Sequence, residues 1–203
     1  DNPNSPIPNC KIILTNKKKI FFFSCPKKIS LIKKNNNYKN FIYCTYGDFS
    51  NVVNDLSGKN FCVDEMTCSV ANESIITKKF KIKLKTDPCY IMKSIKNKFE
   101  IKNMISAHIK DGLALTKFIY WMKHNKKKKI TEVMAQNKLE QFRKLNKSYL
   151  FPSFNTIAGS GSNGAIVHYR ATKKSDKIIK DSDIFLCDSG GQYKFGTTDV
   201  TRT

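Results

Sequence analysis

Short apolar runs separated by polar turns dominate the first 86 residues, and runs of this length are typical of β-strands. The first two runs flank a short polar turn and predict a hairpin, while the last alternates apolar residues with lysine, as a half-exposed strand does. Residues 48–56 and 67–75 predict short helices. The runs that predict strands are 12–14, 20–23, 41–44, 61–64 and 80–84. Strands that alternate with short helices indicate a mixed α/β domain, and Asp87-Pro88 favours a boundary near Thr86 because the residue before proline leaves the helical region.

A long helical pattern follows this boundary. Residues 91–124 place apolar side chains at 3–4 spacing, which predicts a helix with one buried stripe. The predicted stripe consists of Ile101, Ile105, His108, Gly112, Leu115, Ile119 and Met122. His108 is a metal-ligand candidate in principle, but a hydrogen-bonded interface histidine is the favoured interpretation. Thr131 predicts the N-cap of a second helix, with Glu132 in its first turn, and this helix turns Ala135, Leu139 and Phe142 toward the core.

The segment 155–170 contains a literal GxGxxG pattern. Its glycines match the dinucleotide-binding fingerprint, and Asp181 and Asp183 lie about 20 residues further on, where a ribose-binding acid would stand. That fingerprint requires a helix to open at the third glycine, whereas the β-branched and aromatic run Ala165–Arg170 follows here. We therefore expect a strand, a glycine-rich loop and a second strand that carries His168, and nucleotide binding is disfavoured.

Two acids stand at unusual places in residues 183–203. The apolar run Ile184–Cys187 ends in Asp188, and after a glycine-rich connection Asp199 stands among β-branched residues, a pattern that predicts two antiparallel strands joined by a loop. Asp is disfavoured inside strands and is seldom buried unless it is paired or coordinates a metal. The two acids therefore indicate a shared cation site. Their spacing is equally compatible with a hairpin that carries two solvated turn acids.

The charge of the chain is strongly positive, with 37 basic and 16 acidic residues and a formal net charge of +21. Such a charge suits nucleic acids or anionic membrane surfaces, but only Arg143, Arg170 and Arg202 are arginines, and the reading of base edges favours arginine. Lysines accompanied by asparagines indicate a compositional bias instead. No apolar run reaches the about 18 residues that a membrane span needs. We therefore expect neither a nucleic-acid nor a membrane partner.

The seven cysteines show no CxxC or zinc-ribbon spacing. Several of them lie in apolar runs, as Cys44 and Cys187 do. We expect buried free thiols in a reducing compartment, and hence a cytoplasmic protein.

Three stretches of the chain resemble one family. Residues 188–203 read DSGGQYKFGTTDVTRT, 155–170 read NTIAGSGSNGAIVHYR, and 102–122 read KNMISAHIKDGLALTKFIYWM. They resemble the metal-binding signature, the segment with the substrate histidine and the first catalytic-domain helix of aminopeptidase P, the Xaa-Pro aminopeptidases of the pita-bread metallopeptidase family. The resemblance implies an α/β (α+β) fold. In it, residues 1–86 form the end of a creatinase-type α/β domain, where the resemblance is fainter, and residues 87–203 form the first part of a pita-bread catalytic domain.

The resemblance implies a hydrolase with two divalent metal ions, expected to be Mn²⁺, which removes an N-terminal residue that precedes proline. Asp188 matches the family's chelating aspartate, Asp199 its bridging aspartate, and His168 the histidine that contacts the bound peptide. A metal-activated hydroxide attacks the scissile carbonyl. The family's His and two Glu ligands and its general base are expected beyond Thr203, so the chain is expected to be truncated, without a catalytic residue of its own, inactive alone and weak in metal binding.

Two other functions stay open. A Xaa-Pro dipeptidase shares the fold, although the preceding domain and the NGAIVHY and DSGGQY sequences favour the aminopeptidase. A non-catalytic binding module of the same fold need not keep metal ligands, whereas Asp188 and Asp199 are both present. The resemblance implies peptides with proline in second position as partners, and association into a homodimer.

Overall fold

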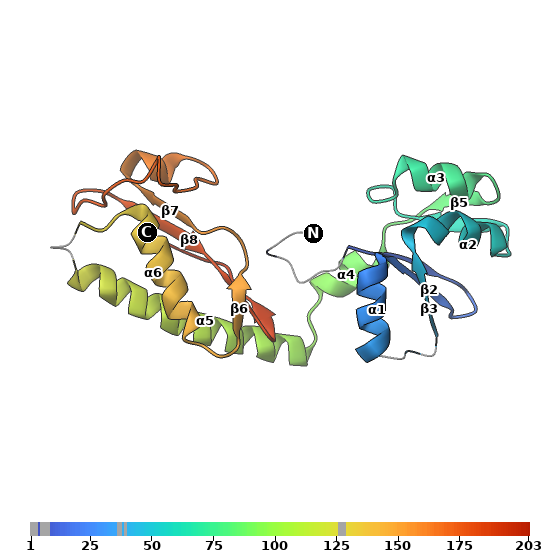
Figure 1. Ribbon diagram of the computed structural model, residues 1–203, viewed down its shortest axis with the longest axis horizontal. Helices are drawn as coiled ribbons and strands as arrows, with labels where there is room; N and C mark the ends of the chain where they lie inside the picture. The colour runs from blue at the N-terminus through green and yellow to red at the C-terminus, as the bar shows by residue number, and fades with distance from the viewer. Residues whose placement is uncertain (1–3, 5–8, 36–37, 39, 126–128) are drawn as a thin grey trace. The chain divides into compact units, whose positions relative to one another are not determined.

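The computed structural model describes residues 4, 9–35, 38, 40–125 and 129–203 (Figure 1). Contacts divide the chain into two compact units, of which unit 1 ends at Ile95 and unit 2 contains Lys96–Thr203. No helix among the described residues has both the length and the apolar character that crossing a membrane requires.

Unit 1 builds two small sheets from short strands. Its elements are β1 (Lys11–Leu14), β2 (Ile20–Ser24), α1 (Pro26–Asn35), β3 (Phe41–Thr45), the 3₁₀ turn η1 (Tyr46–Asp48), α2 (Phe49–Asp55), β4 (Asn60–Val63), α3 (Val70–Thr77), β5 (Lys81–Leu84) and α4 (Pro88–Ser94). β1 pairs antiparallel with β2, which confirms the predicted hairpin. β2 runs parallel to β3, and β4 runs parallel to β5. Because parallel strands need a crossover connection, α1 and α3 supply the two crossovers.

The lysine-rich sequence of α1 does not reveal this helix by its pattern. The helix begins with Pro26, whose fixed backbone angle suits a first helical position, and its Ile29 is buried. α3 begins at Val70, three residues later than the predicted start at Thr67, because Ser69 caps it by accepting a hydrogen bond from the Asn72 amide at 3.3 Å.

The core of unit 1 is apolar. Phe23 and Phe49 meet edge to face, with ring centroids 5.4 Å apart, and Val53 is fully buried beside them. The buried cluster consists of Ile13, Phe23, Phe49, Val53, Ile76 and Phe80. Packing of apolar faces from the sheets and helices therefore holds this unit together.

Unit 2 packs two helices against two three-stranded antiparallel sheets. Its elements are α5 (Lys98–His124), α6 (Glu132–Lys144), β6 (Tyr149–Pro152), β7 (Ile157–Ser160), the 3₁₀ helix η2 (Gly161–Ala165), β8 (Phe185–Ser189), β9 (Gly191–Tyr193), β10 (Gly196–Thr197) and β11 (Val200–Arg202). The strand orders are β10-β9-β6 and β11-β8-β7. α5 and α6 contact each other, α5 also contacts β10, and α6 contacts β7 (Figure 1).

The helix predicted over residues 91–124 is interrupted in the structure. α4 ends at Ser94 and α5 begins at Lys98. Asn97 caps α5 by accepting hydrogen bonds from the amides of Phe99 and Glu100, and the Glu100 carboxylate accepts one from the Asn97 amide. This capping box starts a new helix inside the apolar pattern.

The predicted buried stripe of α5 is wrong in its first half. Ile101 and Ile105 are 48% and 57% exposed, and His108 is exposed, with its Nδ1 3.0 Å from the Met104 carbonyl oxygen. The residues that α5 buries are Ala107, Asp111, Ala114, Leu115 and Phe118. Asp111 lies at the centre of the buried face, and a prediction made from apolar positions assigns such a charged residue to the exposed face.

The second strand predicted over residues 165–170 is absent. Residues 161–165 form η2, and a turn follows in which His168 is exposed and has a φ of +54°. Tyr169 is buried next to it. The β-branched residues of this segment do not reach a sheet because polar contacts of Asn163 and Tyr169 hold the segment elsewhere.

Candidate metal centre and substrate loop

β8 carries Asp188, and Asp199 directly precedes β11, the strand that pairs with β8. Asp188 lies opposite Thr201 in the antiparallel register, and the Thr201 hydroxyl donates a hydrogen bond to Asp188 Oδ1 at 2.9 Å. Residues two apart on a strand share a face, and Asp199 stands two residues before Thr201, directly outside β11. Diagonal neighbours of this kind lie about 7–8 Å apart. The register of β8 and β11 therefore favours an arrangement in which the Asp188 and Asp199 carboxylates lie on the same side of the strand pair.

Asp199 does not lie within a strand, contrary to the sequence expectation. It is exposed and stands between β10 and β11. The residue before it, Thr198, is buried, and its hydroxyl accepts a hydrogen bond from the Gly191 amide at 2.9 Å. This inward turn of Thr198 takes the chain out of the strand ladder just before Asp199.

The donor chemistry of the two acids fits hard divalent cations, which prefer carboxylate oxygens. The hydrogen bond from Thr201 leaves the second oxygen of the half-buried Asp188 carboxylate available, and within the described ranges no hydrogen bond engages Asp199. No group of three His, Cys, Asp or Glu side chains in the described part of the chain could hold a metal ion. Asp188 and Asp199 by themselves therefore offer only part of a ligand set.

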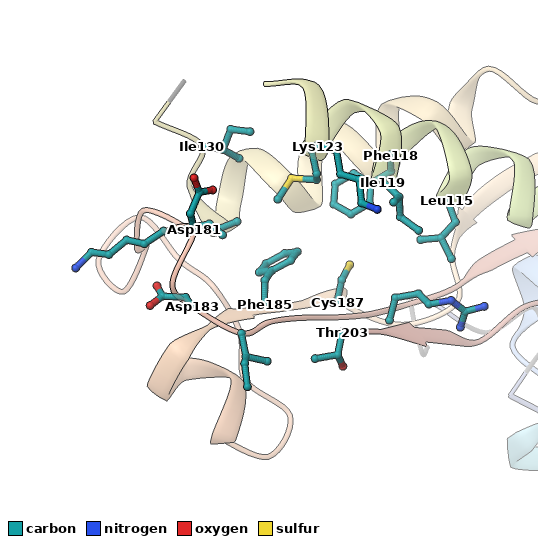
Figure 2. A pocket seen from close by; sticks show the side chains of 15 residues that line it. Leu115, Phe118, Ile119, Lys123, Ile130, Asp181, Asp183, Phe185, Cys187 and Thr203 are labelled. Atoms are coloured by element: carbon teal, nitrogen blue, oxygen red, sulfur yellow. The ribbon is translucent and has the colours of Figure 1, made fainter. Parts of the chain in front are cut away.

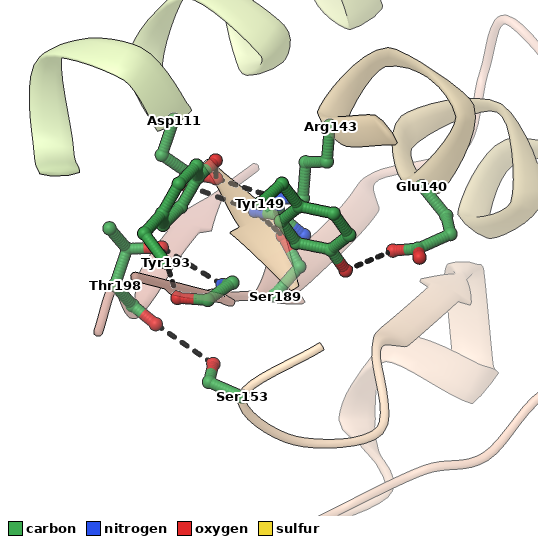
Figure 3. Close-up of polar contacts among 9 residues, drawn as sticks. Asp111, Glu140, Arg143, Tyr149, Ser153, Ser189, Tyr193 and Thr198 are labelled. Carbon is green, nitrogen blue, oxygen red and sulfur yellow. Dashed lines mark hydrogen bonds and ion pairs between the residues drawn. The ribbon is translucent and has the colours of Figure 1, made fainter. Parts of the chain in front are cut away.

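A buried ion pair of Asp111 and Arg143 lies next to Ser189 of β8 (Figure 3), and Ser189 faces the side of the strand opposite to its neighbour Asp188. Arg143 of α6 donates from Nε to Asp111 Oδ1 at 2.7 Å and from Nη2 to Asp111 Oδ2 at 3.1 Å. The same Nη2 donates to the hydroxyl of Ser189 at 3.0 Å, and Ser189 directly follows Asp188 in β8. The forked guanidinium thus joins both helices to the strand that carries the first candidate ligand.

Tyr193 extends this network to β9. Its hydroxyl donates to Asp111 Oδ1 at 2.8 Å. Burial raises the pKa of Tyr193, and the nearby Asp111 raises it further, so the phenol stays protonated as a donor. Burial lowers the pKa of Arg143, but the hydrogen bond and charge of Asp111 more than offset this effect and leave the pKa above its usual value. The buried Arg143 guanidinium therefore stays charged.

Close backbone contacts hold the connection between the two acids. The Ser153 hydroxyl donates to the Thr198 carbonyl oxygen at 2.9 Å (Figure 3). A Cβ added to Gly190 would overlap both of these oxygen atoms, so only glycine fits at this position. The chain on either side of Gly190 and Thr198 thus has little freedom, which limits where Asp188 and Asp199 can stand.

The glycine pattern of 155–170 serves packing. A Cβ on Gly159 would lie 2.8 Å from the Cα and the amide nitrogen of Gly164, so the two backbones need this close approach. No α-helix opens at Gly164, because the residues form a short 3₁₀ helix. Asp183 accepts a hydrogen bond from Ser160 Oγ at 3.0 Å. The structure therefore lacks the helix that a dinucleotide fingerprint requires.

An apolar cavity of about 630 Å³ lies between α5 and β8 (Figure 2). Phe118, Phe185 and Cys187 line it, whereas Asp188, Asp199 and His168 do not. All seven cysteines are free, but Cys187 alone is buried, so the expectation of buried thiols holds only there. Burial raises the pKa of Cys187 to about 11. This cavity is separate from the candidate site.

Three side chains of the buried network behind β8 have little signal in the sequence, namely Asp111, Arg143 and Ser189. Their signal is weak, because an acid on a helix and an arginine on the next helix are usually solvated. Asp111 does fall at helical spacing from Ala107, Ala114 and Phe118, which is the one pattern that marks it as a core position.

Comparisons with known proteins point in one direction. The model of metallopeptidase family M24 matches residues 102–203. The Xaa-Pro aminopeptidase ApepP of Drosophila melanogaster is 42% identical over 139 residues, which cover 68% of this chain and 22% of that protein. The chain thus spans about a fifth of the length of this curated relative.

Solved structures share the fold. The X-prolyl aminopeptidase of Caenorhabditis elegans, described as a cytosolic enzyme with a di-nuclear active site, superimposes with a TM-score of 0.84 at 25% identity, over 98% of this chain and 34% of that chain. A Xaa-Pro dipeptidase of Bacillus anthracis superimposes with a TM-score of 0.71 at 20% identity, over 98% of this chain and 55% of that one.

Proposed function

The chain belongs to metallopeptidase family M24, and we propose that it contributes to an aminopeptidase that releases the N-terminal residue from peptides with proline in second position. The match over residues 102–203 carries this proposal, together with the 42% identity to a Xaa-Pro aminopeptidase. The expected fold class, mixed α/β with the pita-bread architecture of this family, is confirmed. The activity is proposed for the full-length protein, because the chain spans only part of its relatives.

The domain assignment, the homodimer and the cytoplasmic location are part of this proposal. Residues 1–86 are assigned to the end of a creatinase-type domain and residues 87–203 to the beginning of the catalytic domain. The fold shared with the Caenorhabditis elegans enzyme supports this assignment.

Asp188 and Asp199 are the proposed ligands of two divalent cations, with Mn²⁺ as the expected ion. When bound, such a pair of cations polarises the scissile carbonyl and activates a water molecule as nucleophile. Asp188 is held by Thr201 at one oxygen and offers the other, while Asp199 projects from the short connection before β11. Further His and Glu ligands and the general base are proposed to come from other parts of the full-length protein.

His168 is the proposed contact for the peptide substrate. Its imidazole is exposed, and no hydrogen bond or ion pair within the described residues engages it. His168 has a φ of +54°, which is uncommon for a residue with a side chain, and strained backbone positions cluster at active sites and ligand clamps. The exposed ring is thus free to meet a peptide.

A dipeptidase is the second candidate, because a Xaa-Pro dipeptidase shares the fold. The experiment that separates the candidates is an assay of the full-length protein, after chelation and dialysis, on the tripeptide Arg-Pro-Pro and on the dipeptide Arg-Pro. We expect release of arginine from the tripeptide when Mn²⁺ is added back. Cleavage of the dipeptide alone supports the dipeptidase, and cleavage of neither supports a non-catalytic module.

Variants test the proposed ligands. Asp188→Asn or Asp199→Asn is expected to lower kcat/KM at least about 100-fold, since the cations then lose a charged ligand. Asp181→Asn makes the same chemical change at an exposed acid outside the site and is expected to have no effect. Full activity of Asp188→Asn would contradict the assignment. Residues 1–203 alone are expected to be inactive and to bind Mn²⁺ weakly in a titration.

A further inference from the structure

Glu132 is a fully buried carboxylate for which the described residues provide no cationic partner. Its charge is met by hydrogen-bond donors from one segment, residues 160–177. Oε1 accepts from the Ser160 amide at 2.7 Å and from Asn163 Nδ2 at 3.0 Å. Oε2 accepts from the Tyr169 hydroxyl at 2.8 Å and from the Lys177 amide at 3.3 Å. A buried anion persists only with such complete hydrogen bonding.

The position of Glu132 in α6 adds to this stabilisation. Glu132 is the first residue of the helix, which Thr131 caps by accepting a hydrogen bond from the Met134 amide at 3.2 Å. A negative charge in the first turn of a helix is favoured by the helix dipole. A well-anchored helix end therefore presents the carboxylate to the segment.

Polar contacts, rather than a helix or a sheet, hold the segment between η2 and Lys177. After η2 it contains no α-helix and no strand, apart from a single bridge of Ile178 to Thr131 just beyond it. Asn163 Nδ2 also donates to the Tyr169 hydroxyl at 2.8 Å. The two ends of the turn that contains His168 are thus tied to each other and to Glu132.

The neighbouring pair of His168 and Tyr169 shows what this arrangement achieves. Tyr169 is 8% exposed and points to Glu132, while the adjacent His168 is exposed and adopts a φ of +54°. A backbone in this region is unfavourable for a residue with a Cβ and persists only when its surroundings hold it. The hydrogen bond from Tyr169 to Glu132 fixes the residue that directly follows His168 in the chain.

We propose that Glu132 is a positioning residue, whose carboxylate holds Asn163 and Tyr169 and thereby fixes the direction in which His168 meets the peptide. The inference rests on the proposed function of His168. Glu132 touches neither the proposed metal ligands nor His168 itself, so it acts through the segment alone.

The test uses Glu132→Gln in the full-length protein. Glutamine replaces one carboxylate oxygen with an NH₂ group, which cannot accept the hydrogen bonds that the segment donates to Glu132 in the wild-type protein. We therefore expect about tenfold faster hydrogen exchange at the backbone amides of residues 161–177. For Arg-Pro-Pro, kcat/KM is expected to fall about tenfold while the bound metal per protomer stays unchanged. Glu140→Gln, on the same helix but partly exposed, is the matched control and is expected to change neither quantity.

A double-mutant cycle with His168→Ala decides whether Glu132 acts through His168. In the His168→Ala background, Glu132→Gln is expected to change kcat/KM by less than about twofold, because the two effects are then coupled. Independent, multiplying effects, or unchanged exchange in the segment, would overturn the proposal while leaving the aminopeptidase function intact. If the wild-type protein cleaves no peptide, the proposed function is wrong, and the role of Glu132 in positioning His168 toward a peptide is wrong with it. Hydrogen exchange still measures whether Glu132 holds residues 160–177 in place.

A milder variant covers the case in which Glu132→Gln does not fold. Tyr169→Phe removes one hydrogen bond to Glu132 and keeps the aromatic ring. The same exchange increase, smaller in size, and the same coupling to His168→Ala are expected. If Tyr169→Phe changed neither the hydrogen exchange nor the coupling to His168→Ala, this result would contradict the proposal.

Discussion

The two units of the chain bury different kinds of side chain. In the described part of unit 1, the buried cluster is apolar and Ser24 is the single buried polar residue. Unit 2 buries an ion pair and a carboxylate in addition to its apolar cluster. Its buried polar and charged residues are Asp111, Glu132, Arg143, Ser160, Asn163, Ser189, Gln192 and Thr198.

Buried charges seldom add stability over well-packed apolar groups of the same size, so their concentration in unit 2 calls for another explanation. Each candidate site residue there has an immediate neighbour in the chain that is buried and hydrogen-bonded. The three pairs are Asp188 with Ser189, Asp199 with Thr198, and His168 with Tyr169. The comparison indicates that unit 2 uses directional contacts to orient exposed groups, whereas apolar packing holds unit 1 together.

The largest expected effect breaks the ion pair of unit 2. Asp111→Ala leaves the Arg143 charge buried without a partner, and the free energy of unfolding should fall by about 3–5 kcal/mol. Urea unfolding of the full-length protein measures this change. Asp111→Asn keeps an oxygen acceptor for Tyr193 and should cost less. A loss below about 1 kcal/mol for Asp111→Ala would show that the pair is not as isolated from water as its burial indicates.

An intermediate effect is expected from the apolar core of unit 1. Ile76→Ala removes a side chain that is 2% exposed and leaves a cavity, so the free energy of unfolding should fall by about 3 kcal/mol. The comparison predicts that Mn²⁺ binding and kcat/KM at moderate temperature stay as in the wild-type protein. If Ile76→Ala weakened Mn²⁺ binding, the proposed difference between the units would be wrong.

The smallest effect concerns the Cys187 thiol on the cavity side of β8. Its pKa is about 11 in the folded protein, above its value in the unfolded chain, so the folded state holds the proton more tightly. Stability from this group is complete below the unfolded pKa and declines as pH rises toward the folded pKa. Between pH 8 and pH 10, the free energy of unfolding should fall by about 1–2 kcal/mol more than in Cys187→Ala. Equal slopes for the two proteins in urea titrations would contradict this expectation.

Local sequence signals predicted many elements correctly. The paired runs 12–14 and 20–23 form a hairpin, and Thr131 caps α6, because a polar turn and a capping hydroxyl act over a few residues. β8 ends near Asp188, as its apolar run indicated. The alternation of β5 between lysine and apolar residues is likewise a local property of the strand.

Long-range polar contacts account for the errors. The buried face of α5 centres on Asp111, whose burial depends on Arg143, 32 residues later in the chain. The segment 165–170 has the composition of a strand, but Glu132 draws Tyr169 away from any sheet across 37 residues. No window of the sequence contains both partners of such a contact, so periodicity could not reveal either outcome.

The amino-acid sequence by itself determined the family, the β1–β2 hairpin, the cap of α6 and the candidate residues Asp188, Asp199 and His168, because short motifs and local periodicity carry that information. Tertiary structure alone decided how Asp188 is oriented, on which turn His168 projects, and which charges become buried. The physical reason is that a buried charge is tolerated only where distant segments bring donors and acceptors together, and that meeting exists only in the folded chain.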